Sequence, residues 1–251
     1  MTREIDLQYV NEILVKRMKV KRQPVAITYV REGQTLPDVY EPVNVVACQI
    51  VRLAETGRAI YVDATHHDCR VGQYHLGLET TDDPFITEGE YLTSAQGFFT
   101  EEGARCNKKQ SYSLPEGSIT ALAAAPLNAV PDTVDVDLVV CICNAQQTMQ
   151  IAGAASVREG TFPHGELGAS ACSSIFAAPW HTQNSVFALG DGGGRAFNRV
   201  AVGEMFVSIP KHHLRYIIEL MENFSINPQK MREVIMPSYA PQAVNQSTVE
   251  E

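Results

Sequence analysis

Three cysteines of this chain lie where a thiol can bind a metal. Cys48 opens an apolar run with helical spacing, Cys69 follows a polar loop and precedes another helix, and Cys172 opens a run of small residues. Amide dipoles at a helix start lower the pKa of a thiol and favour the thiolate, the form that binds metals. Separate loops commonly hold iron–sulfur clusters in this way, whereas zinc accepts three cysteines with one histidine or aspartate. The sequence therefore predicts a [4Fe-4S]-type iron–sulfur site at these cysteines, with zinc as the alternative.

The other cysteines have different surroundings. Cys141 and Cys143 belong to a continuous apolar run, where buried thiols pack as small hydrophobic groups, and we expect them to be structural. Cys106 is flanked by the cations Arg105 and Lys108. We expect it to be an exposed thiol or, alternatively, a fourth ligand from a turn-rich excursion over residues 85–109, which is itself a lid or a surface feature.

A glycine-rich loop, residues 190–195, follows a predicted strand. Glycines let the backbone approach a ligand closely, and an arginine can clamp a carboxylate or phosphate. The loop therefore predicts a site for a small anionic molecule or cofactor at Gly192, Gly193, Gly194 and Arg195. Its spacing fits neither the dinucleotide-binding nor the phosphate-loop pattern, and a tight turn explains the glycines equally well. Asp191, within the same loop, is the candidate for a fourth metal ligand.

Two segments with one order of elements would position these side chains. The first runs from Cys48 through a helix and a strand to a loop that ends at Cys69. The second runs from Cys172 through a helix and a strand to the loop at Asp191. We interpret this as a degenerate twofold repeat of cysteine–helix–strand–loop. If each loop folds back towards the start of its helix, the thiols approach one another.

Strands alternate with helices along the rest of the chain, which is typical of an α/β or mixed α+β fold. The most apolar strands, at 119–125 and 136–143, are expected to be central and covered on both faces. Further strands are predicted at 25–30, 59–62, 185–189 and 204–209. No linker divides the chain, so we expect a single domain over residues 1–236. Residues 237–251 form a polar C-terminal tail with no core pattern.

Composition excludes several classes of protein. A formal net charge of −9 argues against a nucleic-acid partner, which needs a basic surface. No apolar run approaches the roughly 20 residues of a membrane span, and the first residues lack the apolar core of a signal peptide. Six cysteines in such a chain are more typical of reduced thiols or metal ligands than of disulfides. We therefore expect a soluble cytoplasmic protein with neither a membrane nor a nucleic-acid partner.

Several of these features together resemble the domain-of-unknown-function family 169. The residues that carry the resemblance are Ala47-Cys48-Gln49, His67-Asp68-Cys69 with Gly72 and Leu76-Gly77-Leu78 beyond it, Cys172 before a small-residue helix with Pro179, and the Gly-Gly-Arg before Phe197. The similarity runs from about Pro24 to Phe224. In the family pattern a further cysteine often stands just before the Gly-Arg loop, where this chain has Asp191. Asp191, Cys106 and an open coordination position therefore remain alternatives at the fourth ligand position.

The expected function is an iron–sulfur protein of anaerobic metabolism. An open iron position would act as a Lewis acid on a small anionic substrate that Arg195 or a histidine orients. One alternative is a non-catalytic module that binds an anionic metabolite or cofactor at the glycine-rich loop. Another is a thiol enzyme in which Cys69 is the nucleophile and His66 or His67 the base. The tail carries too little apolar surface to fold alone, and an outside surface that holds it predicts a homo-oligomer, in which the tail lies across a neighbouring copy or back along its own core.

Overall fold

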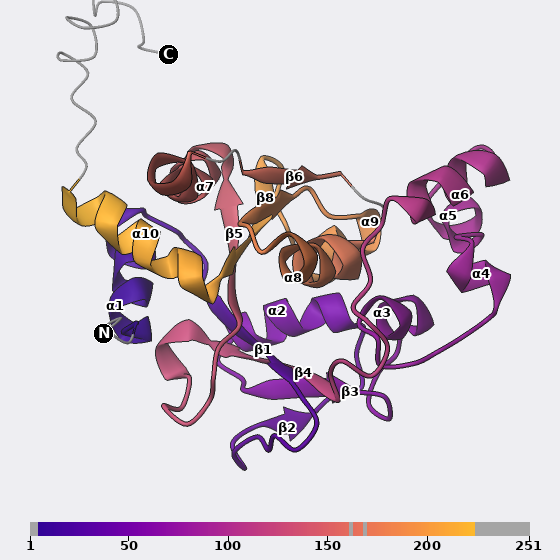
Figure 1. The fold of residues 1–251 in the computed structure, drawn as a ribbon, viewed down its shortest axis with the longest axis horizontal. Coiled ribbons are helices and arrows are strands. Elements are labelled where there is room, and N and C mark those ends of the chain that lie inside the picture. The colour runs from indigo at the N-terminus through magenta and orange to yellow at the C-terminus, as the bar shows by residue number, and fades with distance from the viewer. Residues whose placement is uncertain (1–4, 161–162, 168–169, 224–251) are drawn as a thin grey trace, which may run out of the picture.

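Eight strands form one mixed sheet in the order β2-β3-β4-β1-β5-β8-β7-β6 (Figure 1). The computed structural model describes residues 5–160, 163–167 and 170–223. The strands are β1 Val25–Val30, β2 Glu41–Pro42, β3 Ile60–Asp63, β4 Ala121–Pro126, β5 Leu138–Asn144, β6 His164–Glu166, β7 Val186–Ala188 and β8 Glu204–Pro210. The mixed α/β fold predicted from the sequence is confirmed.

The middle of the sheet is built from the chain's most apolar strands. All residues of β1 and β4 are buried, as are all of β5 except Asn144. β1 pairs antiparallel with β4 on one side, where Val30 lies opposite Ala121, and with β5 on the other, where Val25 lies opposite Val140. The apolar runs at 119–125 and 136–143 are central, as predicted, since β4 and β5 each pair with a strand on both sides and bury residues on both faces.

Helices pack on both faces of this sheet (Figure 1). They are α1 Leu7–Glu12, α2 Ile50–Glu55, α3 Arg70–His75, α4 Pro84–Thr87, α5 Tyr91–Ala95, α6 Glu101–Lys109, α7 Ala145–Glu159, α8 Ala178–Thr182, α9 Gly192–Phe197 and α10 Lys211–Asn223. Short turns of other helical types occur at η1 Ile13–Arg17, η2 Ala47–Gln49, η3 Leu127–Ala129 and η4 Ser173–Ala177. One core joins α2, η2, η4 and the end of α3 to the sheet, and another joins α1, α7 and α10 to the opposite face.

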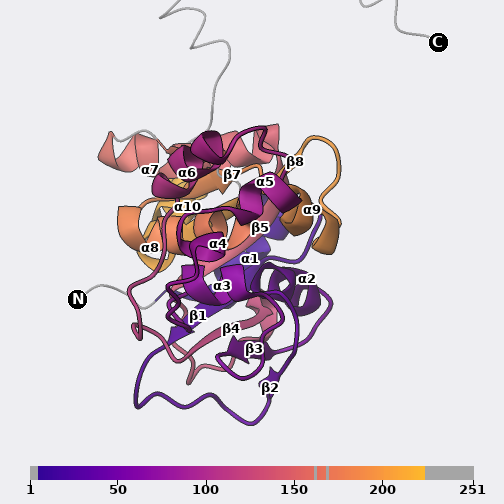
Figure 2. The ribbon, with the colours of Figure 1, turned by 90° about the vertical axis from the view of Figure 1, so that its right-hand side faces the viewer.

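The excursion at 85–109 forms the short helices α4, α5 and α6. These helices form a lobe beyond α3 at the right of Figure 1, and the lobe faces the viewer in Figure 2. Tyr91, Leu92 and Ala104 form a small separate core inside the lobe, against which Val71 of α3 packs. The lobe is therefore attached to the sheet through α3.

The two halves of the chain place their strands in the sheet in the same order, counted from each outer edge towards the middle. The first half supplies β2-β3-β4-β1 and the second β5-β8-β7-β6, and β1 pairs with β5 at the junction. In both halves the outer pair of strands is parallel and the next pair antiparallel. η2, with Cys48, and η4, which follows Cys172, each stand between the two strands of the outer pair along the chain. A twofold repeat would produce this order, and descent from a duplication stays a prediction.

The structure differs from the sequence-based expectation at the glycine-rich loop, which is shorter than predicted because Gly192 already begins α9. On α10, His213 is only 2% exposed, and its Nδ1 lies 2.9 Å from Ser185 Oγ.

Some expectations concern the C-terminal residues. The predicted tail at 237–251, the boundary at residue 236 and the oligomer inferred from them lie outside the described residues. Within the ranges that are described, none of the helices has the length and apolar character needed to cross a bilayer.

Candidate metal centre

Cys48, Cys69 and Cys172 come together on one face of the sheet. Cys48 lies in η2 at the start of α2, Cys69 precedes α3, and Cys172 precedes η4, while α3 contacts both η2 and η4. The Cys172 thiol forms a hydrogen bond with that of Cys48 and is near enough to Cys69 and Asp191 to interact with them electrostatically. Cys48 and Cys172 are each 6% exposed. Three separate elements thus deliver thiols to one largely buried place.

Cys69 and Asp191 each cap the N-terminus of a helix, one in each half of the chain. Cys69 is the N-cap of α3, and its Sγ accepts a hydrogen bond from Gly72 N at 3.3 Å. Asp191 is the N-cap of α9, and its Oδ1 accepts from Gly194 N at 2.6 Å. Its other oxygen, Oδ2, accepts from Ala171 N at 2.6 Å. Asp191 therefore ties α9 to the residue before Cys172, and both of its oxygens already serve backbone amides.

The expectation that amide dipoles lower the thiol pKa values is wrong for two of these cysteines. Burial raises the pKa of Cys69 even though Gly72 donates to its sulfur. The hydrogen bond with Cys48, together with burial, raises the pKa of Cys172 well above its usual value. Desolvation outweighs the short helix starts, and the neutral thiol is favoured. A bound metal would reverse this balance, because its positive charge displaces the thiol protons.

His67 places a hydrogen-bond donor beside the thiols. Its Nδ1 accepts from Cys69 N at 3.0 Å, which assigns the remaining ring proton to Nε2. Nε2 is buried and has no partner, and burial lowers the pKa of the imidazole to about 4. A Cβ added at Gly72 would lie 2.8 Å from the ring Cε1 and 3.4 Å from Cys172 Sγ. The ring and the Cys172 thiol therefore flank a space that only a glycine leaves open.

This tautomer bears on the thiol-enzyme alternative. With Nδ1 occupied and Nε2 protonated, His67 has no free lone pair to act as a base or to bind a metal. His66 instead contacts Asp63, whose Oδ1 lies 3.0 Å from its Nδ1. The local geometry therefore gives Cys69 no ready base.

Tyr91 of α5 is a site residue that the sequence analysis missed. It is 5% exposed, and its hydroxyl is buried without a hydrogen-bond partner. Burial raises its pKa, and the Cys172, Asp191 and Cys69 side chains add to this effect, so the phenol lies within electrostatic range of the thiols. An aromatic residue within an acidic, turn-rich segment gave no local signal for this position.

The remaining cysteines stand apart from this group. Cys141 and Cys143 are each 1% exposed and belong to the core on the opposite face of the sheet. Cys106 is exposed on α6, where its thiol contacts Glu102 Oε1 at 3.4 Å. The two strand cysteines thus match the structural role expected of them.

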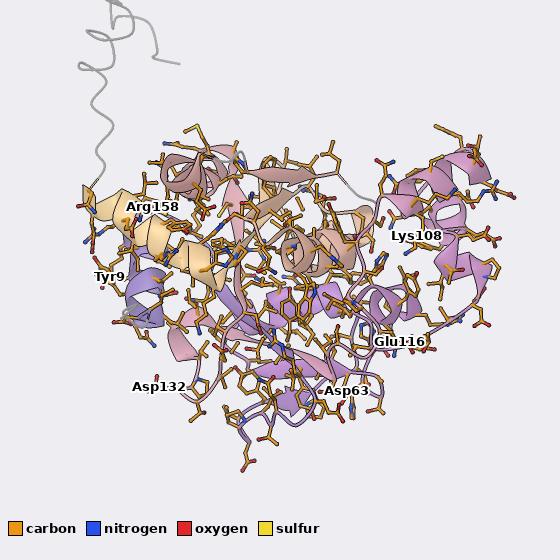
Figure 3. The ribbon with its side chains drawn as sticks, viewed as in Figure 1. Tyr9, Asp63, Lys108, Glu116, Asp132 and Arg158 are labelled. Carbon is orange, nitrogen blue, oxygen red and sulfur yellow. The ribbon has the colours of Figure 1, made fainter. Side chains whose placement is uncertain are left out.

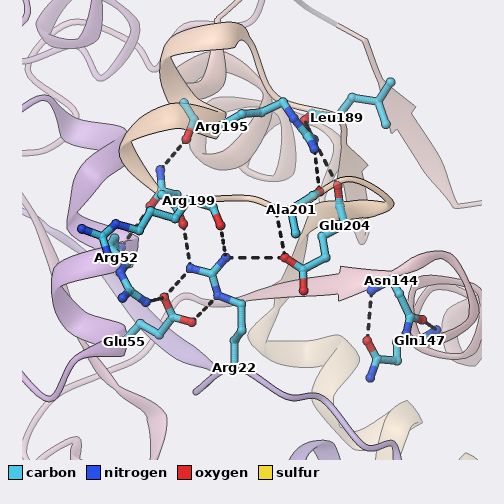
Figure 4. A network of polar contacts seen from close by, with 12 residues as sticks. Arg22, Arg52, Glu55, Asn144, Gln147, Leu189, Arg195, Arg199, Ala201 and Glu204 are labelled. Carbon is cyan, nitrogen blue, oxygen red and sulfur yellow. Dashed lines mark hydrogen bonds and ion pairs between the residues drawn. The ribbon is translucent and has the colours of Figure 1, made fainter.

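The residues of the glycine-rich segment cap α9 and pack against neighbouring elements. Gly190 has a φ of +74°, which favours glycine, and a Cβ on Gly194 would lie 2.5 Å from that of Ala171. Arg195 donates from Nη1 to Leu189 O at 2.8 Å and to Glu204 O at 3.0 Å, and from Nη2 to Ala201 O at 2.8 Å (Figure 4). The geometry gives Gly194 and Arg195 structural tasks, so anion binding at Gly192–Arg195 stays a prediction.

A polar network fixes the turn that carries Cys48. Asn198, fully buried, donates from Nδ2 to Cys48 O at 3.0 Å and accepts from Arg52 N at 3.0 Å. Arg22 holds the Asn198 carbonyl through Nη2 at 2.7 Å and also donates to both carboxylate oxygens of Glu55 on α2 (Figure 4). The start of α2 is therefore locked to the end of α9, across the two halves of the chain.

The thiols are not arranged around a single-ion position. Among residues 5–160, 163–167 and 170–223, no three cysteine, histidine, aspartate or glutamate side chains form a group that could hold a metal ion. A cubane cluster separates its thiolates more widely than one tetrahedral ion does. Within the described part of the chain, the three thiols therefore lie near one another without forming a preformed zinc site.

The chain belongs to the domain-of-unknown-function family 169. The family model, described as "Uncharacterised ArCR", matches residues 13–220, and the resemblance seen in the sequence is confirmed. An uncharacterized protein of Methanocaldococcus jannaschii is 24% identical over 231 residues, which cover 86% of this chain and 96% of that relative. No solved structure matches the chain.

Proposed function

We propose that this protein binds an iron–sulfur cluster of the [4Fe-4S] type through Cys48, Cys69 and Cys172. The observation that supports the proposal is the convergence of three thiols from three separate elements on one largely buried face. Clusters are commonly held by thiolates from separate loops. The sheet cysteines across the fold have neither the loop setting nor the polar neighbours.

Two unpartnered donors suit such a group. The His67 Nε2–H, across Gly72 from the Cys172 thiol, and the Tyr91 hydroxyl, within electrostatic range of the thiols, are both buried without hydrogen-bond partners. A buried donor without an acceptor is costly, so each is better satisfied when something that accepts hydrogen bonds is bound. Cluster and thiolate sulfurs accept hydrogen bonds, and such bonds help to set a cluster's potential. The residues present therefore fit the proposed group.

The fourth position is proposed to be open. Both oxygens of Asp191 already accept amide hydrogen bonds, and Cys106 lies exposed on α6. An open iron would supply Lewis acidity to a small anionic substrate. His67 and Tyr91 would donate hydrogen bonds to that anion. We place this activity in anaerobic metabolism and in the cytoplasm, where thiols remain reduced.

Metal analysis of anaerobically purified protein tests the proposal. We expect iron and acid-labile sulfide in the wild type, with the broad visible absorption of a cluster. Cys48→Ser, Cys69→Ser and Cys172→Ser should each lower the iron content sharply. Cys141→Ala is the matched control, since it removes a buried thiol on the opposite face. It should cost about 1–2 kcal/mol of stability and leave the iron content unchanged.

Other outcomes would point elsewhere. Stoichiometric zinc in place of iron would favour a mononuclear site. Metal-free protein with a Cys48–Cys172 disulfide after exposure to air would favour a redox-active thiol pair, because these two thiols interact with each other. Loss of iron in Cys141→Ala at unchanged folding would show that the wrong cysteines were chosen.

A further inference from the structure

Lys108 of α6 is a buried cation whose charge is not paired. It is 7% exposed, and its Nζ lies 3.0 Å from His75 Nε2 and 4.3 Å from the centre of the Tyr74 ring. Within the described ranges, no carboxylate forms an ion pair with it. Burial lowers the pKa of its ammonium to about 8. A buried charge normally has a counter-ion, so this position is unusual.

The neighbouring histidine does not supply that counter-ion. His75 is fully buried, and its Nδ1 lies 2.7 Å from Tyr112 O, which assigns the ring proton to Nδ1. Nε2 is therefore an acceptor for one N–H of Lys108. Burial and the Lys108 charge lower the pKa of His75 to about 3, so the ring is neutral at physiological pH. One ammonium hydrogen serves His75 and the Tyr74 face attracts another, which leaves a third.

Lys108 lines a pocket of about 340 Å³ at the base of the α4–α6 lobe, where Figure 3 labels it. The remaining lining residues are Tyr74, Thr87, Glu88, Arg105, Lys109, Ser111 and Ser113. Three cations and three hydroxyl side chains of serine and threonine thus surround the space, opposed by one carboxylate. The volume is at the lower end of the range for small-molecule sites.

The stem of Lys108 is held in place. A Cβ added at Gly89 would lie 2.7 Å from Lys108 Cβ and 3.1 Å from Cγ, and Gly89 has a φ of +80°. The backbone of the lobe therefore closes over the side chain. Such a clamp opposes the swing into solvent by which a lysine usually avoids burial.

We infer that this pocket binds a small oxyanion, such as a carboxylate, sulfate or phosphate group, through the unused N–H of Lys108. Lys109 and the hydroxyl of Ser113 add further donors, and Arg105, which already pairs with Glu101 and Glu102, adds positive charge to the lining. The site lies at the opposite end of α3 from Cys69, and it does not depend on the proposed cluster.

Sulfate titration followed by calorimetry on the full-length protein tests the inference. Lys108→Met removes the ammonium and keeps much of the stem, and the control Lys16→Met removes an exposed lysine charge on η1, which does not line the pocket. We expect sulfate to bind the wild type and Lys16→Met with affinities within a few-fold of each other. Lys108→Met should weaken binding about tenfold or more, as expected for a lost charge-assisted hydrogen bond.

A pH series on the wild type keeps the test decisive if Lys108→Met fails to fold. Sulfate keeps its charge between pH 7 and 9, whereas Lys108, with a pKa of about 8, loses its proton. Affinity should therefore fall about tenfold over this range. The other groups facing Lys108 are His75 and Tyr74 on α3, Glu88 after α4, and Arg105 and Lys109 on α6. An exposed lysine or arginine site would keep its charge to pH 9.

Three results would overturn the inference. They are the absence of measurable sulfate binding, an affinity that stays constant from pH 7 to 9, and a folded Lys108→Met that binds as tightly as the wild type. Formate and inorganic phosphate, titrated in the same way at pH 7, then show whether the pocket prefers a carboxylate or a phosphate group.

Discussion

Three histidines lie in surroundings that keep the imidazole neutral. Burial lowers the pKa of His67 and of His213 to about 4 and that of His75 to about 3. His75 uses its two ring nitrogens as one donor and one acceptor, an arrangement that a second proton would disturb. At the scale of residues, desolvation is therefore the dominant electrostatic effect, for these rings as for the thiol of Cys69.

The free energy of unfolding should fall as the pH drops below 6.5. The unfolded chain then takes up protons that the folded histidines accept only near pH 3 to 4. For His75 alone, the loss between pH 6.5 and pH 5 amounts to about 2 kcal/mol. Denaturant unfolding measured across this range should show a shallower pH dependence for His75→Gln. His212→Gln, at an exposed neighbour of His213, should leave the pH dependence unchanged, and equal slopes in all three proteins would contradict the explanation.

At the scale of elements, two helical glycines have opposite surroundings. Gly72 lies in the first turn of α3, between the His67 ring and the Cys172 thiol. Gly153 lies inside α7, a fifteen-residue helix whose start is closed by a capping box of Asn144 and Gln147. Nothing stands within 4 Å of a Cβ added at Gly153. Helix propensity favours alanine at both positions, and only packing separates them.

Gly153→Ala should raise the free energy of unfolding by about 0.5–1 kcal/mol, because alanine loses less backbone entropy in a helix. Gly72→Ala should not stabilise the protein, since its methyl group would press on His67 and fill the space beside Cys172. We also expect it to lower the iron content of anaerobically purified protein. Urea unfolding and metal analysis of both variants check this pair, and normal iron in Gly72→Ala would place the cluster elsewhere.

At the scale of the whole molecule, the two halves share one core. Val25, Ile27 and Ile60 from the first half pack in the same cluster as Val140 and Phe176 from the second. β1 and β5 also share a ladder of backbone hydrogen bonds at the junction. Separation of the halves would expose both that ladder and the apolar face beneath the cysteine turns.

A fragment of residues 1–130 should therefore not fold cooperatively alone. Circular dichroism during heating should show a broad transition, whereas a mixture with residues 131–251 should recover the sharp transition of the intact chain. The reason is that a strand edge and an apolar face are costly when they lack their partners. Sharp unfolding of the isolated fragment would instead indicate two independent domains.

Much of the fold follows from local patterns. β1 coincides with the run of apolar and β-branched residues at 25–30, and β8 begins at the predicted residue 204. The cysteines could be sorted by their immediate neighbours, since polar loops and helix starts mark Cys48, Cys69 and Cys172, and a continuous apolar run marks Cys141. Such features depend on side-chain periodicity and backbone preference, which a short stretch of sequence already contains.

Tertiary structure alone decided what surrounds those residues. Lys108 meets His75 across 33 positions of sequence, and Tyr91 reaches the thiols from a lobe whose own sequence predicted only turns. Arg195 was expected to hold an anion. Its guanidinium instead donates to the backbone carbonyls of Leu189, Ala201 and Glu204. Burial and partner choice arise when distant elements pack together. They set the pKa values, the unpaired donors and the pockets, none of which has a local signature.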